Sequence, residues 1–306
     1  MEKVAPGSLR PIDGMAALLI VLCCACWGLN QVAIKVANAG IPPMLQAGLR
    51  SMLSATLLLG WARARGIPLF GRDGSLWPGI ATGVVFGVEF VLLYKGLNWT
   101  TASHGVLFLY SMPFFVAVGA HLLIPGDRLT KPKIIGLCAA FAGLAIALSG
   151  GFGGEAGGVS LLGDLMCIAA GIGWAATTLI IRTTALKSVS AEKVLFYQLA
   201  VSVPVMIGAS LIAGESAPSF ADPGVVIAFT YTVVVVAFIS YVVWFWLLSR
   251  HSPSAISAFT FLTPIFGALA GAVILGEALT FRIAIALVLV AWGIYLVNRP
   301  AGAARA

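Results

Sequence analysis

Ten apolar stretches, each about as long as a membrane is thick, dominate this sequence. A helix needs about 20 apolar residues to cross a hydrocarbon layer of about 30 Å. Stretches of near this length lie at 15 to 37, 42 to 62, 77 to 97, 101 to 124, 132 to 149, 161 to 182, 192 to 213, 224 to 248, 254 to 276 and 281 to 298. With 60% hydrophobic and 9% charged residues, the chain cannot make an ordinary water-soluble surface. The sequence predicts an all-α membrane protein with ten transmembrane helices, since the segments lack the alternation of barrel strands.

Basic residues gather in the connections on one side of the predicted membrane. If the N-terminus is cytoplasmic, the cytoplasmic segments carry most of the Lys and Arg residues, whereas the opposite connections carry only Arg282. Lys35, Arg50 and Lys95 lie within or at the ends of spans. The positive-inside rule therefore predicts a multi-pass protein of the cell inner membrane with both termini cytoplasmic. This distribution explains the net charge of +7 without a nucleic-acid partner.

Two stretches half a sequence apart share an ordered series of Ser, Phe, Pro, acidic residue, Leu, Thr and Gly. The first series is Ser103, Phe108, Pro113, Asp127, Leu129, Thr130 and Gly143, and the second is Ser254, Phe259, Pro264, Glu277, Leu279, Thr280 and Gly293. Five helices per half make the second half enter the membrane from the opposite side. We expect two inverted five-helix repeats around a central cavity, at 1–149 and 161–306, joined by a Gly-rich linker at 150–160.

Further matches extend the repeat toward the start of each half. Trp27 precedes Lys35 by the same eight residues that separate Trp174 from Arg182, and Arg50 corresponds to Gln198. On these landmarks, together with Trp27-Gly28 and Pro42-Pro43, the chain resembles the ten-helix EamA type of the drug/metabolite transporter superfamily over nearly its whole length. The resemblance implies helices 1 to 4 and 6 to 9 around the cavity, with helices 5 and 10 more peripheral. Among members the chain looks most like the YddG group, which implies export of aromatic amino acids.

Polar and aromatic residues at helical spacing define candidate cavity faces, because residues three or four apart project to the same side of a helix. The alternative for each aromatic is packing between helices or anchoring at the headgroups. The predicted substrate-binding residues are Trp27, Asn30, Gln31, Tyr94, His104, Phe108, Ser111, Trp174, Thr178, Tyr241, Trp244 and Phe259. Phe108 and Phe259, as repeat partners, are expected to form opposing walls, while Tyr110 is displaced from the face of Phe108.

Glu89 is the acid predicted deep within a span, where an ionisable group is costly. It is expected to be a proton or charge site, accepting a proton or pairing with a substrate ammonium. The alternatives are a structural partner for Lys95, Lys35 or Arg50, or a protonated group in a helix contact.

Pro113 and Pro264 each free a backbone carbonyl and permit a bend, so the pair is expected to act either as hinges or as static kinks. Asp127 and Glu277 are expected to cap or position the helices that follow them. Lys35 and Arg182 are candidates for closing a gate or for snorkelling.

These observations favour a secondary transporter that exports small amphipathic metabolites, aromatic amino acids above all, by alternating access. The alternative is a broader exporter of drugs or other amino acids, facilitative or proton-coupled. Because no P-loop, HExxH or GxSxG sequence occurs, we expect neither an enzyme nor a cofactor. The five cysteines lack a zinc-type spacing, so no metal site is predicted. The expected partners are a small-molecule substrate and the lipid bilayer, with the oligomeric state, monomer included, left open.

Overall fold

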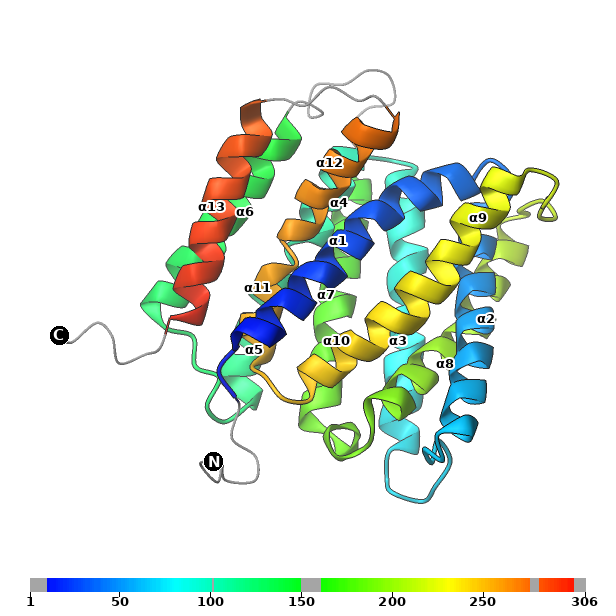
Figure 1. Cartoon of the computed structure of the whole chain (residues 1–306), viewed down its shortest axis with the longest axis horizontal. Coiled ribbons are helices and arrows are strands. Elements are labelled where there is room, and N and C mark those ends of the chain that lie inside the picture. Colours follow the sequence, from blue (N-terminus) through cyan, green and yellow to red (C-terminus); the bar gives the residue numbers. More distant parts are fainter. Residues whose placement is uncertain (1–9, 101, 150–160, 276–280, 300–306) are drawn as a thin grey trace.

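The computed structural model describes residues 10–100, 102–149, 161–275 and 281–299, which form helices and one isolated β-bridge between Arg10 and His251. Figure 1 shows the helices packed into one bundle, with α1 and the α9–α10 span tilted relative to α2 and α3. The elements are α1 (Gly14–Ala37), α2 (Pro43–Ala64), α3 (Leu76–Leu97), α4 (Ala102–Leu109), α5 (Met112–Leu123), α6 (Lys131–Leu148), α7 (Leu161–Thr183), the short 3-10 helix η2 (Ala185–Ser188), α8 (Ala191–Ile212), α9 (Pro223–Tyr231), the π-helix η3 (Thr232–Ser240), α10 (Tyr241–Leu248), α11 (Pro253–Phe259), α12 (Leu262–Leu275) and α13 (Phe281–Asn298).

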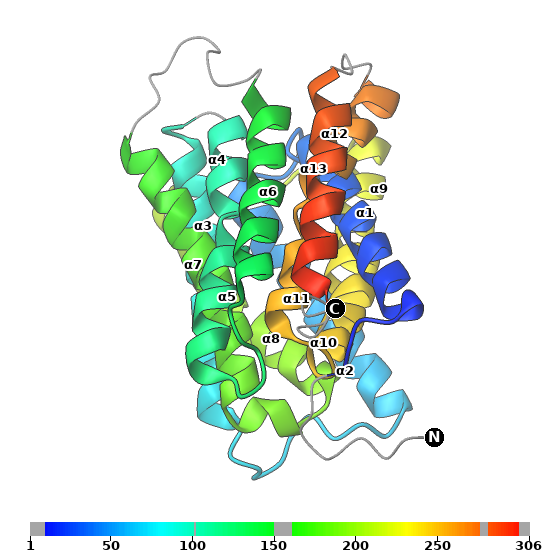
Figure 2. The same ribbon diagram turned by 90° about the vertical axis from the view of Figure 1, so that its left-hand side faces the viewer.

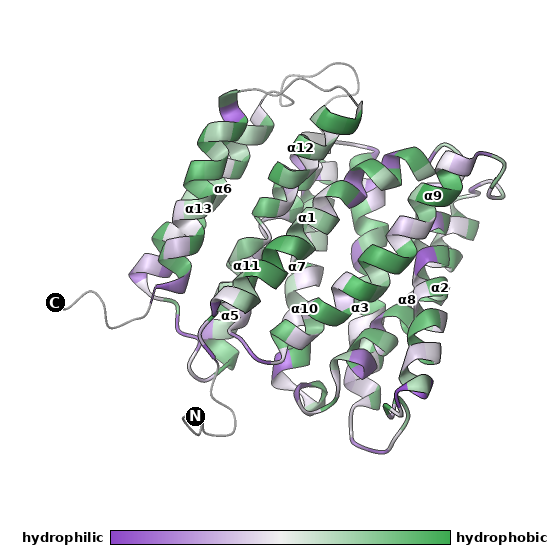
Figure 3. Cartoon of the chain, viewed as in Figure 1, coloured by the Kyte–Doolittle hydropathy of each residue, from purple (hydrophilic) through white to green (hydrophobic). Residues whose placement is uncertain are grey.

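These elements make an all-α membrane fold. Among the described residues, nine helical stretches are long and apolar enough to cross a membrane, with α4–α5, α9–α10 and α11–α12 each counted as one. The tenth is α2, which has 22 residues but a lower mean hydropathy, because it carries Gln46, Arg50 and several hydroxyl residues. It packs against α8 inside the bundle. Figure 3 shows hydrophobic residues along most of the helix surfaces, where large apolar side chains such as Leu18, Leu211 and Val273 are exposed.

The two proline-containing spans are broken, as their sequences predict. The first break lies at Tyr110 and Ser111, between α4 and α5, and the second lies at Thr260 and Phe261, between α11 and α12. Pro113 and Pro264 stand in the first turn of α5 and α12, where a missing backbone N–H costs least. A residue with a backbone N–H at these positions would donate to the carbonyl four residues earlier, which belongs to Leu109 at the end of α4 in one span and to Thr260, within the break, in the other.

The packing of the helices is the same when the halves are exchanged. The first helix of one half, α1, packs against the α9–α10 span and against α12. The first helix of the other half, α7, packs against the equivalent partners α3, α4 and α5. The ends also fit an inverted arrangement: in Figure 1, α1 begins and α13 ends toward the same side, whereas α7 begins at the opposite side.

The fifth helices of the two halves, α6 and α13, meet backbone to backbone. Figure 2 shows them side by side. A Cβ atom on Gly136 would lie 2.5 Å from the Gly293 carbonyl oxygen, and one on Gly143 would lie 3.0 Å from the Ala286 carbonyl oxygen. Because Gly143 and Gly293 are repeat partners, the same spacing pairs Gly136 with Ala286. Exchanging the halves thus converts one contact into the other, as expected where a two-fold axis passes between these helices.

Candidate functional site

A cavity of about 470 Å³ lies among helices of both halves. Its walls come from α1, α2, α3, the α4–α5 break, α7, α8, η3 and α10. Of the residues predicted to bind substrate or charge, nine line it: Trp27, Asn30, Gln31, Glu89, Tyr94, Trp174, Thr178, Tyr241 and Trp244. The residues predicted on α1, α7 and α10 from helical spacing therefore line the same cavity.

Four predicted residues lie outside the described lining of this cavity. The His104 Nδ1 atom lies 3.2 Å from the Asp164 Oδ2 atom of α7, and the Ser111 hydroxyl donates to the Phe108 carbonyl at 2.6 Å. Phe108 contacts His104 edge to face, and Phe259 is buried in the apolar core. Phe108 and Phe259 are therefore not opposing cavity walls. The cavity is lined here by Leu109, on a different face of α4, and by Tyr110 in the break that follows it.

An aromatic cluster centred on Trp27 forms one wall. Trp27 packs edge to face against Trp244, Tyr241 and Trp174, at centroid distances of 5.1, 6.1 and 6.3 Å. Its indole N–H donates to the Ser240 hydroxyl at 2.8 Å, and that hydroxyl donates to the Val236 carbonyl. Because the buried N–H of its indole is satisfied, Trp27 is held in one orientation at the centre of this wall.

Arg50 enters the cavity from α2 and was not predicted as a site residue. Its guanidinium carbon lies 4.8 Å from the centroid of the Phe90 ring, a cation–π contact. The side chain is 3% exposed, and its Nε and Nη2 atoms have no hydrogen-bond partner among the described residues. A buried cation without an ion-pair partner among the described residues is costly, which points to a role in binding.

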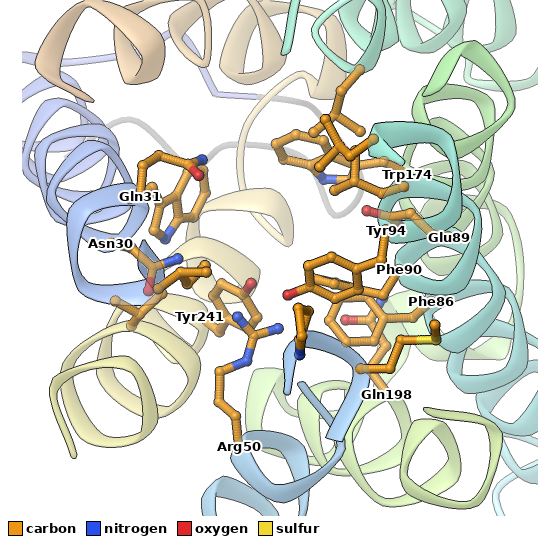
Figure 4. A pocket seen from close by; sticks show the side chains of 18 of the residues that line it. Asn30, Gln31, Arg50, Phe86, Glu89, Phe90, Tyr94, Trp174, Gln198 and Tyr241 are labelled. Atoms are coloured by element: carbon orange, nitrogen blue, oxygen red, sulfur yellow. The ribbon is translucent and has the colours of Figure 1, made fainter. Parts of the chain in front are cut away.

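Glu89 and Asn30 face the same cavity with unmet hydrogen-bonding capacity. Glu89 is 6% exposed and its Oε2 atom has no partner among the described residues; the same holds for the Oδ1 atom of Asn30, which is 7% exposed. Figure 4 shows Glu89 on the α3 wall and Asn30 on the α1 wall, with Arg50 entering from below. The ion pairs found among the described residues do not include Glu89, although the positive charge of Arg50 acts on its carboxylate. A structural role beside Arg50, or as a protonated group in a helix contact, stays the alternative prediction.

The cavity reaches one end of the molecule, where α1, α3 and α8 end. Asn38 and Asn98 line it there with exposed side chains. Glu215, just after α8, accepts hydrogen bonds from the backbone N–H groups of Met44 and Leu45 at 3.1 and 2.8 Å, so it caps the first turn of α2. Glu215 also lines the cavity and was missed, because capping across two halves leaves no local signal in the sequence.

Polar contacts join helix ends at the opposite end of the bundle, called the closed end here because the residues of these contacts do not line the cavity. Lys193 pairs with Asp73 at 2.7 Å, and the Arg182 guanidinium donates to the Ser249 carbonyl at 3.0 Å. Arg182 thus has a partner at this end, as a gate residue would require. Hydrogen bonds to Asp73 from Lys193 and from Ser75 hold the pKa of that carboxyl well below its usual value.

Asp127 is buried at this closed end and joins the two halves. It accepts from Lys133 of α6 at 2.5 Å and from Ser252 at 2.6 Å, and from Ser254 at the start of α11. Burial alone would raise the pKa of Asp127, but the hydrogen bonds from Lys133, Ser252 and Ser254 outweigh it, so the pKa lies below its usual value. Asp127 was expected to cap or position the helix that follows it. Capping is wrong, because its carboxylate accepts from the backbone N–H of Ser254 in α11 and α6 has no side-chain cap, whereas the bond from Lys133 of α6 agrees with positioning. Glu277 and the linker at 150–160 lie outside the described residues.

Three or more His, Cys, Asp and Glu side chains do not gather at any one point of the described chain. Cys23, Cys24, Cys26, Cys138 and Cys167 are free thiols. The absence of a metal or cofactor stays a prediction.

Comparison with known proteins agrees with this architecture. The model of the EamA-like transporter family matches residues 14–149 and 161–299. The chain is 28% identical over 292 residues to the "Uncharacterized transporter YvbV" of Bacillus subtilis, covering 95% of this chain and 93% of the relative. It is 26% identical over 293 residues to a "Probable amino-acid metabolite efflux pump" of Escherichia coli, covering 93% and 94%. A solved crystal structure with 20% sequence identity shares the fold, with a TM-score of 0.77 over 93% of this chain and 96% of the other. The chain, a multi-pass membrane protein, belongs to the EamA-like transporter family.

Proposed function

We propose that this protein is a secondary transporter that exports small amphipathic metabolites, with aromatic amino acids preferred. The observation that carries the proposal is the cavity between the halves, which combines the Trp27 cluster with Arg50 and Glu89. The Nε and Nη2 atoms of Arg50 and the Oε2 atom of Glu89 have no hydrogen-bond partner among the described residues. Aromatic walls favour an aromatic or large apolar side chain, and fixed polar groups orient the rest of the ligand. The efflux-pump relative supports amino acids as the cargo class.

The direction of transport rests on the proposed orientation. With both termini on the cytoplasmic side of the inner membrane, the mouth at Asn38 and Asn98 faces outward and the closed end at Asp127 faces the cytoplasm. Exchange of conformations between the repeats 1–149 and 161–306 would then open the cavity to the other side. The paired breaks at Pro113 and Pro264 support a bending role for these spans.

The second candidate is a broader exporter of drugs or other amino acids. The openness of the mouth and the neutral hydrogen-bonding groups Gln31, Thr178 and Gln198 favour it, since such groups accept varied ligands. Glu89 is the proposed proton site in a proton-coupled mechanism, and facilitative exchange is the alternative. We propose a carrier rather than an enzyme in either case.

Uptake into proteoliposomes tests these proposals. Labelled Phe, Trp and Thr and a cationic drug are compared with and without a pH gradient. We expect saturable flux of Phe and Trp above that of Thr. Absence of saturable Phe and Trp flux would reject the aromatic assignment, and drug flux above Phe flux would favour the broader exporter. Equal wild-type rates with and without the gradient would reject Glu89 as an obligatory proton site.

A further inference from the structure

We propose that Arg50 and Glu89 together recognise the zwitterionic end of the substrate, Arg50 binding a carboxylate and Glu89 an ammonium group. This inference rests on the proposed function and specifies its substrate class: free α-amino acids rather than amines, carboxylic acids or blocked peptides. Charge recognition would then set the class of cargo, while the Trp27 cluster sets the preference for side chain.

Arg50 has the geometry of a carboxylate receptor. The Phe90 ring supports the guanidinium, leaving the Nε and Nη2 atoms without a partner among the described residues. These two nitrogens lie on one edge of the guanidinium and form the fork that matches the two oxygens of a carboxylate. A ligand carboxylate would therefore satisfy both unmet donors at once.

Glu89 meets the complementary requirement for an ammonium group. Its Oε2 atom is buried without a described partner, and its stem packs against α7 close to Gly173. An ionised carboxylate in this position needs a cation or several hydrogen-bond donors, and an ammonium offers three. Asn30, whose Oδ1 atom is also unpartnered, supplies a neutral acceptor on the facing wall.

The two charges lie at a similar depth in different walls. Arg50 is seven residues after the start of α2, and Glu89 is eight residues before the end of α3, so each lies about two turns from the mouth. They do not form an ion pair with each other or with another described residue. Opposite charges held apart at one depth leave room for a ligand that carries both signs.

Of the two equivalent positions in the sequence repeat, the one in the first half carries the cation. The position equivalent to Arg50 is Gln198, which is 2% exposed and also lines the cavity. Arg50→Gln therefore installs at α2 a side chain that the fold already accommodates at α8.

The test compares three ligands as competitors of labelled Phe in proteoliposomes: Phe itself, phenethylamine, which lacks the carboxylate, and 3-phenylpropionate, which lacks the ammonium. Each analogue lacks one of the two charges of Phe. In the wild-type protein, the apparent affinity of each analogue as a competitor should therefore be more than about tenfold weaker than that of Phe. Arg50→Gln should abolish the preference for Phe over phenethylamine while keeping that over 3-phenylpropionate. Glu89→Gln should do the reverse. Arg50→Lys, which keeps the charge without the fork, should restore part of the lost preference.

Matched controls change the same residue types outside the cavity. Lys193→Gln removes a buried cation paired with Asp73 at the closed end, and Glu192→Gln removes an acid from the first turn of α8. Both should leave the order of the three competitors unchanged. If Arg50→Gln or Glu89→Gln fails to fold, the conservative variants Arg50→Lys and Glu89→Asp and the wild-type analogue series still give the answer.

Several results would overturn the inference alone. One is equal competition by all three ligands in the wild type. Another is an equal loss of apparent affinity for all three ligands in both Arg50→Gln and Glu89→Gln. The third is a Glu89→Gln variant that loses its response to a pH gradient but keeps its preference for Phe over 3-phenylpropionate. Absence of saturable flux for every amino acid would overturn the proposed function together with it.

Discussion

Ser254 donates two hydrogen bonds to Asp127, one from its backbone N–H at 3.2 Å and one from its hydroxyl, across 127 positions of the chain. Asp127 is the acidic landmark of the first repeat and Ser254 is the serine landmark of the second. Two different landmarks of the repeated series, one from each half, therefore meet at the closed end of the cavity. The stability of this closed end should depend on the charge of Asp127.

Asp127→Asn should lower the free energy of unfolding by about 1–3 kcal/mol, because it leaves the ammonium of Lys133 without its partner. The folded-state pKa of Asp127 is depressed, so its contribution is present above the unfolded pKa and is lost as the pH falls through the folded value. Thermal unfolding in detergent should show a constant difference from the wild type between about pH 5 and 8, shrinking below about pH 4. A difference that persists unchanged at pH 3 would contradict this role.

Trp27→Ala should weaken the binding of aromatic substrates about tenfold or more, because it removes the central ring of the aromatic wall that Trp27 forms with Trp174, Tyr241 and Trp244. Trp27→Phe keeps a ring but loses the donor to Ser240, so it should have a smaller effect. The apparent affinity for Phe, measured from the concentration dependence of uptake, gives the comparison. Trp99→Ala is the control, since Trp99 is 47% exposed and outside the cavity lining. Equal affinities for Trp27→Ala and the control would refute the placement of this wall.

Gly293→Ala should destabilise the protein by about 1–3 kcal/mol, because its Cβ atom would meet the Gly136 carbonyl oxygen and force α6 and α13 apart. Gly60→Ala is the matched control: it lies in α2 with no atom within 4 Å of an added Cβ. That change should be neutral or stabilise slightly, since alanine has the higher helix propensity. The two midpoints of thermal unfolding in detergent would decide, and equal midpoints would show that the helices can separate at no cost.

Pro113→Ala and Pro264→Ala should slow turnover if the two helix breaks bend during transport. Alanine supplies the N–H that proline lacks, so the interrupted helix can form one more hydrogen bond and stiffen. The maximal rate and the apparent affinity of Phe uptake separate bending from shaping of the cavity. An unchanged maximal rate in both variants would leave static kinks as the explanation.

Labelling of single cysteines should establish the orientation in the membrane. In a cysteine-free background, a cysteine at Phe220, between α8 and α9, should react with an impermeant maleimide added to intact cells. One at Arg72, between α2 and α3, should react after the membrane is opened. Both native side chains are exposed, so access depends on the side of the membrane. The reverse order of reactivity would place the termini outside.

The spans could be predicted from the sequence because membrane thickness sets the length of each apolar run. The stretch expected at 77 to 97 is Leu76–Leu97, and the one expected at 42 to 62 is Pro43–Ala64. The breaks in two spans followed from proline chemistry. The cavity faces of α1, α7 and α10 followed from helical spacing, since these segments are continuous where Trp27, Trp174 and Trp244 stand.

The remainder of the site depended on contacts between helices, which spacing does not contain. His104 and Phe108 lie before the break at Tyr110, so their face could not be extended across it. Arg50 was identified as the counterpart of Gln198, but its burial beside Phe90 appears only once α2 packs against its neighbours. Intramembrane arginine within an otherwise apolar stretch was the signal that could have located it.

The crossing of α6 and α13 resembles the interface of a two-fold dimer contained in one chain. Helices in backbone contact at two places, Gly136 with Gly293 and Gly143 with Ala286, cannot slide along each other without first separating. Since each contact is the image of the other, exchanging the conformations of the two halves leaves this interface as it was. The pair would therefore form a stationary element, and the rearrangements that move the opening of the cavity would be confined to the other eight spans.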